Sequence, residues 1–85
     1  MSLAVWIRRC AEWHPQKLAL VSGARRYTYR EFNERTNRLT NALVAAGVGR
    51  GDRVAVISNN AAEAVEALGS AAKGGFVHVP ISFRL

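Results

Sequence analysis

Residues 53–85 read RVAVISNNAAEAVEALGSAAKGGFVHVPISFRL, and their pattern indicates the fold class. Two short apolar runs, residues 54–57 and 76–81, flank an alanine-rich segment that ends at a Gly-Gly pair. This order is typical of a strand, a helix and a second strand. Strands joined by such a crossover pair in parallel, and the connection is right-handed. The stretch therefore predicts a βαβ unit, which belongs to the α/β fold class.

The composition of the two runs indicates how the strands are covered. Residues 54–57 are continuously apolar, as in a parallel strand covered on both faces, and the second run nearly repeats this pattern. His78 is the exception. Because no carboxylate, cysteine or serine stands at a catalytic spacing from it, we interpret His78 as a structural or pocket-wall residue. A role as ligand or base is the alternative.

Polar residues follow each strand, Ser-Asn-Asn at 58–60 and Ser-Phe-Arg at 82–84. The carboxyl ends of parallel strands meet at one edge of a sheet, and ligands of open α/β sheets bind there. Arg84 is thus the arginine whose position suggests that it binds an anion. A charged residue on an exposed loop is the alternative interpretation.

The chain begins with a helical pattern over residues 3–13. Apolar residues recur at spacings of three, four and three, and they are Leu3, Trp6, Cys10 and Trp13. His14-Pro15 is expected to end this helix, because the residue before a proline is disfavoured in the α region. We expect the helix to pack on the domain, and contact with a membrane surface is the alternative.

A hairpin and a second helix are expected next. Two β-compatible runs, residues 17–22 and 25–29, flank Gly-Ala. Thr28 and Glu31 have the spacing of a capping box, which predicts that a helix starts there. Its apolar stripe ends before Gly47 and consists of Phe32, Thr36, Leu39, Leu43 and Ala46. The charged residues beside the stripe, which we expect in solvent with weak pairing, are Arg30, Glu34, Arg35 and Arg38.

Residues 47–52, Gly-Val-Gly-Arg-Gly-Asp, are best explained as a turn. A dinucleotide-binding loop follows a strand and opens a helix, whereas this segment follows a helix and opens a strand. Arg-Gly-Asp at 50–52 also matches a cell-adhesion tripeptide, but we interpret these residues as part of the same turn.

Composition limits the remaining possibilities. A chain of 85 residues forms one small domain at most, and its net charge of +6 comes mostly from scattered arginines. We interpret these arginines as solvated, although phosphate-bearing ligands, nucleic acid and anionic membranes remain alternatives. Cys10 is the single cysteine, so neither an internal disulfide nor a cysteine cluster can form. No signal peptide or membrane-length apolar run is present, and we expect a cytoplasmic protein.

Residues 18–85 together resemble the N-terminal region of the adenylate-forming (AMP-binding) superfamily, most of all acyl-CoA synthetases and fatty-acid-CoA ligases. The matching pieces, in order, are LALV at 18–21, YTYREF at 27–32, NRL at 37–39, residues 43–47, GDRVAV at 51–56, Asn60 with residues 63–67, AKGG at 72–75, VP at 79–80 and RL at 84–85. Each piece is short, and their order and spacing make the match specific.

The resemblance implies an incomplete portion of a larger α/β domain, with residues 1–85 as its N-terminal part. Its elements would be a helix, a hairpin, a capped helix and a parallel βαβ unit. It also implies a ligase that uses ATP, Mg²⁺ and CoA to activate a carboxylic acid as an acyl-adenylate and transfer it to CoA. The family's large domain carries a phosphate loop and a ribose-binding aspartate, and its small C-terminal domain carries a catalytic lysine. All of these would lie beyond Leu85, so the 85 residues alone are expected to be inactive.

One residue role comes with the resemblance. In some CoA ligases the arginine that matches Arg84 contacts a phosphate of the CoA nucleotide, in agreement with the placement of Arg84 at a strand end. No catalytic or metal-binding residue can be carried over. Two departures stand out: Ala61-Ala62 replaces a common Ser-Pro, which leaves Asn60 as the expected helix cap, and Ser82-Phe83 replaces a common Asn-Pro.

The expected partners differ between two possible functions, a ligase and a binding module. A ligase would contact a small carboxylic acid, ATP, CoA and the remainder of its own domain; peripheral membrane contact and a homodimer stay open. The alternative is a stand-alone basic α/β module that binds nucleic acid or another anionic partner. We do not expect nucleic-acid binding, because the two tryptophans share an apolar stripe instead of alternating with arginines.

Overall fold

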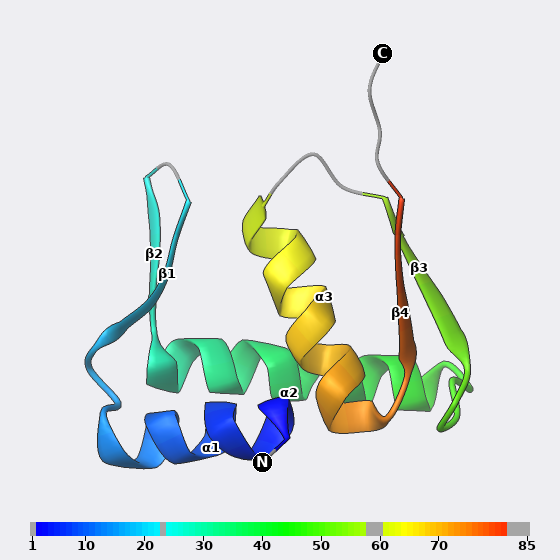
Figure 1. Cartoon of the computed structure of the whole chain (residues 1–85), viewed down its shortest axis with the longest axis horizontal. Coiled ribbons are helices and arrows are strands. Elements are labelled where there is room, and N and C mark those ends of the chain that lie inside the picture. Colours follow the sequence, from blue (N-terminus) through cyan, green and yellow to red (C-terminus); the bar gives the residue numbers. More distant parts are fainter. Residues whose placement is uncertain (1, 23, 58–60, 82–85) are drawn as a thin grey trace.

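The computed structural model describes residues 2–22, 24–57 and 61–81. Within these ranges, three helices and four strands follow one another (Figure 1). They are α1 (Leu3–Trp13), β1 (Leu18–Ser22), β2 (Arg25–Thr28), α2 (Tyr29–Ala45), β3 (Arg53–Ile57), α3 (Ala61–Gly74) and β4 (Val77–Ile81). This order confirms the predicted α/β class and the sequence of helix, hairpin, capped helix and βαβ unit.

The βαβ unit has the predicted parallel pairing. β3 and β4 pair in register from Arg53 opposite Val77 to Ile57 opposite Ile81. Gly75 ends the intervening helix with a φ of +73°, the left-handed conformation that glycine adopts without strain. The expectation that both faces are covered is not met in this chain, because Val77 is 46% exposed and Ala55 is also exposed. α3 packs on one face of this two-stranded sheet, and residues of the other face are exposed to solvent.

The hairpin and its junction with α2 also agree with the sequence. β1 and β2 pair antiparallel. The Thr28 hydroxyl accepts a hydrogen bond from the Glu31 amide at 3.2 Å, and the Glu31 carboxylate accepts one from the Thr28 amide at 3.0 Å. The bond from the Thr28 amide lowers the pKa of the Glu31 carboxyl. The capping box therefore fixes the start of α2 directly after β2.

α1 has the predicted bounds, and His14 caps its end. The predicted apolar stripe is wrong, however, because the buried residue of this helix is Ile7. Trp13 is 69% exposed, with the Arg9 guanidinium over its ring at 5.9 Å. Trp6 is partly exposed and packs edge to face on Tyr29, at 5.8 Å between ring centroids. The face that α1 buries is set by its contact with α2 and α3, which its own periodicity does not reveal.

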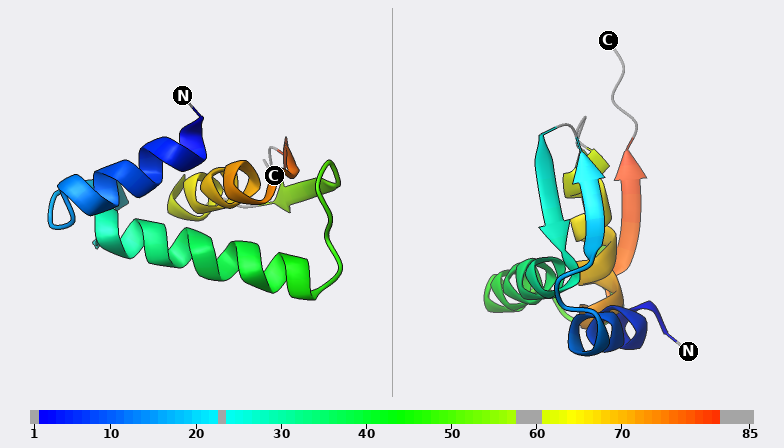
Figure 2. Two further views of the ribbon diagram at one scale, coloured as in Figure 1. Left: turned by 90° about the horizontal axis from the view of Figure 1, so that it is seen from below. Right: turned by 90° about the vertical axis from the view of Figure 1, so that its left-hand side faces the viewer.

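The core lies where the three helices meet. α2 is the longest helix, and both α1 and α3 contact it (Figure 2). Among the residues whose burial the structure describes, the buried apolar side chains are Ile7, Phe32, Ala71 and Phe76, and the buried polar ones are Thr36 and Ser70. The Thr36 hydroxyl donates to the Phe32 carbonyl at 2.9 Å, so its burial leaves no unpaired donor. The small size of this core matches the length of the chain.

Residues 47–52 form the predicted turn between α2 and β3. Gly47 and Gly51 have φ values of +100° and +84°, which favour glycine. The Gly49 amide donates to the Asp52 carboxylate at 2.6 Å. None of the described helices is both long and apolar enough to cross a membrane.

Candidate functional site

The carboxyl ends of β3 and β4 lie at one edge of their sheet, as the sequence predicts for a ligand site (Figure 1). The parallel register ends with Ile57 beside Ile81. The polar residues expected to bind ligand come next, at 58–60 and 82–84. These residues, including Arg84 and the expected cap Asn60, lie outside the described part of the chain. The structure thus locates the strand ends, and the role of Arg84 stays a prediction.

His78 lies on β4 opposite Val54 and is half-buried. Its Nε2 atom is buried and has no hydrogen-bond partner. A general base is normally oriented by a hydrogen-bonded neighbour, and Nε2 has none here. Among the described residues, no group of three or more His, Cys, Asp or Glu side chains could hold a metal ion. The geometry gives His78 no catalytic assignment, and the structural interpretation remains a prediction.

A lysine that the sequence did not single out ties α3 to α2. The Lys73 ammonium donates to the Asn33 carbonyl at 3.0 Å, the Asn33 side-chain oxygen at 2.7 Å and the Asn37 side-chain oxygen at 2.7 Å. An ammonium has three protons, so these acceptors satisfy it. Burial lowers the pKa of Lys73 to about 8. The i,i+4 spacing of the two asparagines could have indicated a shared helix face, but nothing local pointed to Lys73.

A polar groove of about 510 Å³ lies beside this lysine, between α1, α2 and the end of α3. Its lining residues are Ala4, Val5, Arg8, Asn33, Asn37, Thr40, Asn41 and Lys73. The ammonium protons of Lys73 are already donated to Asn33 and Asn37, and the Arg8 guanidinium lies 3.9 Å from the Glu12 carboxylate on its own helix. The groove therefore offers hydrogen-bonding amides and no activated nucleophile or base.

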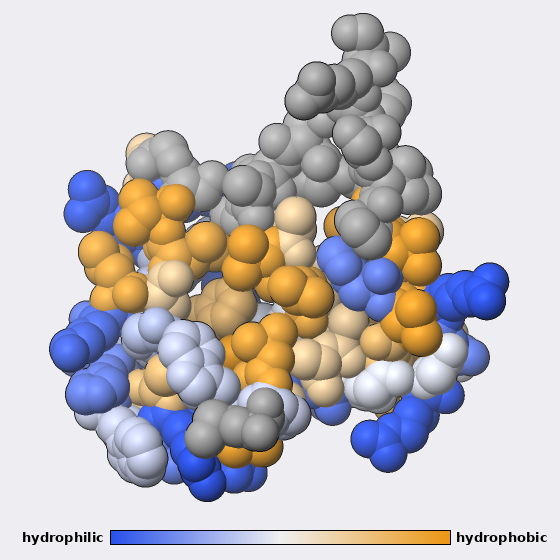
Figure 3. Space-filling view, viewed as in Figure 1, coloured by the Kyte–Doolittle hydropathy of each residue, from blue (hydrophilic) through white to orange (hydrophobic). Residues whose placement is uncertain are grey.

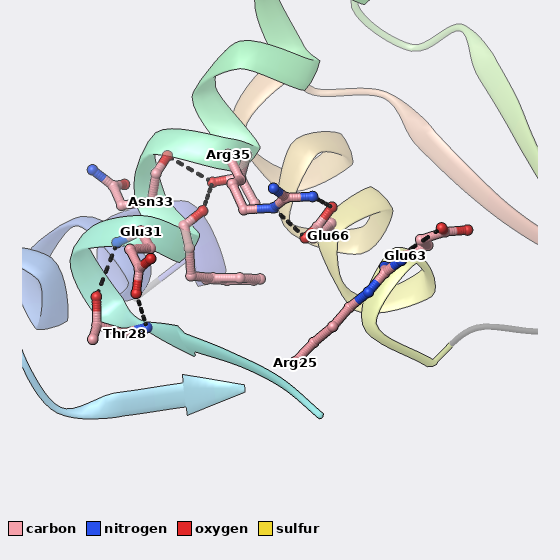
Figure 4. A network of polar contacts seen from close by, with 9 residues as sticks. Arg25, Thr28, Glu31, Asn33, Arg35, Glu63 and Glu66 are labelled. Atoms are coloured by element: carbon pink, nitrogen blue, oxygen red, sulfur yellow. Dashed lines mark hydrogen bonds and ion pairs between the residues drawn. The ribbon is translucent and has the colours of Figure 1, made fainter. Parts of the chain in front are cut away.

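A second polar cluster joins α2, α3 and the hairpin (Figure 4). The Arg35 guanidinium binds the Glu66 carboxylate through two bonds, at 2.6 and 3.3 Å. It also lies over the Tyr27 ring, 4.6 Å from the centroid. The Glu66 side chain is only 12% exposed. The weak local pairing expected of Arg35 is wrong, because Arg35 pairs with Glu66 on α3, while 40% of its side chain is exposed. Arg30, Glu34 and Arg38 do form the expected exposed i,i+4 pairs.

The family is decided by the match along the chain. A model of the AMP-binding enzyme family matches residues 7–85. This chain belongs to the AMP-binding enzyme family. A feruloyl-CoA synthase of Amycolatopsis sp is 41% identical over 83 residues, which is 98% of this chain and 17% of that protein. The chain thus spans about a sixth of the length of this curated relative.

Solved structures of AMP-binding enzymes share the fold of this segment. A fatty acyl CoA synthetase of Mycobacterium tuberculosis superimposes with a TM-score of 0.90 at 36% identity, over 99% of this chain and 17% of that chain. The N-terminal domain of FACL13 from Mycobacterium tuberculosis gives 0.90 and 36% over 99% of this chain and 22% of that chain. The resemblance noted in the sequence is confirmed, and the described fold is that of a partial α/β domain.

Proposed function

We propose that this chain is the N-terminal segment of an ATP-dependent acyl-CoA ligase. The observation that carries the proposal is the ordered match over residues 7–85 to AMP-binding enzymes, with similar proteins named as a feruloyl-CoA synthase and a fatty acyl CoA synthetase. In such a ligase the acid carboxylate attacks the α-phosphate of ATP, forming an acyl-adenylate and releasing pyrophosphate. The CoA thiol then attacks the acyl carbon and AMP leaves, which gives the thioester.

The role of this segment in that reaction is structural and, at Arg84, binding. Residues 1–85 form the N-terminal part of the large adenylate-forming domain in this proposal, and the groups that bind ATP and Mg²⁺ belong to the part that follows. The 85 residues alone are inactive in this proposal, and the protein works in the cytoplasm. The comparisons lend no support to the nucleic-acid-binding module that the basic composition left open.

A hybrid enzyme tests the proposal. Residues 1–85 replace the matching segment of the Mycobacterium tuberculosis fatty acyl CoA synthetase, and fatty-acid-dependent ATP–pyrophosphate exchange and acyl-CoA formation are measured. We expect the hybrid to retain both activities, whereas a version that lacks the segment should have neither. A folded hybrid that carries out neither reaction would contradict the proposal.

Arg84 gives a sharper prediction within this hybrid. Arg84→Ala should raise the KM for CoA about tenfold or more, since a hydrogen bond to a charged group contributes roughly 1.5–3 kcal/mol. Pyrophosphate exchange should be nearly unchanged, because adenylation precedes CoA entry. Arg38→Ala is the control, because the Arg38 side chain is exposed and its guanidinium makes a weak ion pair with the Glu34 carboxylate, at 4.0 Å. An equal loss in both assays would show that Arg84 supports folding instead of CoA binding.

A further inference from the structure

Several large apolar side chains of α1 and α3 surround a hollow on one face of the molecule. The hollow has a volume of about 180 Å³, and Ile7, Phe32 and Gly69 form its buried floor. Exposed residues form its rim, which we call the apolar rim: Leu3, Trp6, Val65 and Leu68. Figure 3 shows apolar residues gathered across the same face. Contiguous exposed apolar surface of this kind marks an interaction site.

α3 has the composition of a helix that is covered on more than one side. Ala71 is buried on the side that faces the core, while Val65 and Leu68 sit one turn apart and are exposed. A helix that is apolar around most of its circumference is normally buried all round. The uncovered side of α3 therefore needs a partner with an apolar surface.

The sheet beside α3 calls for the same kind of partner. β3 and β4 form a two-stranded parallel sheet, and Val77 on it is exposed. Parallel sheets occur almost only with both faces covered, and two strands alone are marginal in water. A partner that both adds a strand and covers the apolar rim would satisfy sheet and helix together.

Chain length identifies the occupant. This chain superimposes on 22% of the FACL13 N-terminal domain, so about four-fifths of that domain lies outside the match. We propose that the apolar rim is the surface on which the remaining part of the AMP-binding N-terminal domain docks. The inference rests on the proposed function, because it takes the partner from the ligase domain. A second copy of this chain and a lipid surface are the competing occupants.

Thiol reactivity in the hybrid enzyme tests this docking. In a Cys10→Ser background whose other accessible cysteines are also removed, one variant carries Leu68→Cys and a matched variant carries Val44→Cys. The two positions are similarly exposed in this chain, 45% and 55%, and Val44 lies on α2 outside the rim. We expect a soluble maleimide to react at position 68 at least about tenfold more slowly than at position 44. Similar rates in the folded hybrid would overturn the proposal.

The readout is separate from catalysis. A folded but inactive hybrid in which the thiol at position 68 is protected would support the docking and refute the ligase function. An active hybrid in which maleimide reacts equally fast at positions 68 and 44 would support the ligase function and refute the docking. If the hybrid does not fold, the tagged 85-residue chain is co-expressed with the complementary FACL13 domain fragment. A 1:1 complex lost in Leu68→Asp and kept in Val44→Asp supports the docking. No complex, a homodimer through the rim, or binding of anionic vesicles instead would overturn it.

Discussion

Lys73 shows how this fold holds a half-buried cation with neutral groups. Its three protons go to oxygens of Asn33 and Asn37, which lie a turn apart on α2. Hydrogen bonds to these oxygens favour the charged form, while burial disfavours it. Burial prevails, and the pKa falls to about 8. The lysine is therefore a structural link whose strength depends on pH.

The pH dependence has a definite sign. Between about pH 8, the folded pKa, and its ordinary value of 10.5, the unfolded chain binds more protons at Lys73 than the folded chain does. This group should therefore make the free energy of unfolding rise with pH across that window. Denaturant titrations at several pH values should show the rise in the wild-type chain and a flatter profile in Lys73→Met. A wild-type profile no steeper than that of the variant would contradict the lowered pKa.

At the scale of elements, the Arg35–Glu66 pair joins α2 to α3. Because the pair is bidentate and Glu66 is mostly buried, it should contribute more than an exposed pair does. A double-mutant cycle with alanine should give a coupling energy of about 1–3 kcal/mol. The exposed Arg30–Glu34 pair on α2 is the control, with about 0.3–0.5 kcal/mol expected. Equal coupling in both cycles would show that burial and geometry add nothing.

Gly69 allows the three helices to approach one another. A Cβ at this position would lie 2.9 Å from Thr36 Cγ2 and 3.3 Å from Ile7 Cδ1. Gly69→Ala should therefore lower the free energy of unfolding by about 1–3 kcal/mol, despite a helix-propensity gain of about 1 kcal/mol. Gly49→Ala, whose Cβ would meet only Asp52 at 3.5 Å, should change it by less than about 0.5 kcal/mol. A stabilised Gly69→Ala chain would mean that the helices pack less closely.

Local signals predicted the elements well. The spacing of Thr28 and Glu31 correctly predicted where α2 starts, and the Gly-Gly pair correctly predicted where α3 ends. The face of α1 was not predictable, because Ile7 is buried by helices that come later in the chain. The same limit applies to polar contacts. Lys73 bonds to an asparagine 40 positions away, and only the crossing of α2 and α3 brings them together.

The candidate site could be predicted only in part. The parallel register of β3 and β4 confirms that both strand ends share an edge, which follows from the βαβ pattern alone. Arg84 was assigned from this geometry and from the family resemblance, and it lies outside the described residues. The polar groove beside Lys73 was not foreseen, because its lining comes from three helices.

At the scale of the whole molecule, the exposed apolar face and the family match lead to the same conclusion. A chain that belongs to the AMP-binding enzymes and spans 17% of a CoA-synthase relative exposes apolar side chains on β4 and α3. Both features support our proposals that this chain is the N-terminal segment of a larger domain and that the remaining part of that domain covers the apolar rim.

The most direct measurement is to read the coding DNA that follows the codon for Leu85. We expect the reading frame to continue into a Ser/Thr/Gly-rich loop followed by Pro-Lys-Gly, the phosphate-binding segment of the adenylate-forming enzymes. A stop codon directly after Leu85 would contradict the proposed ligase function, because the fold would then exist without the residues that bind ATP.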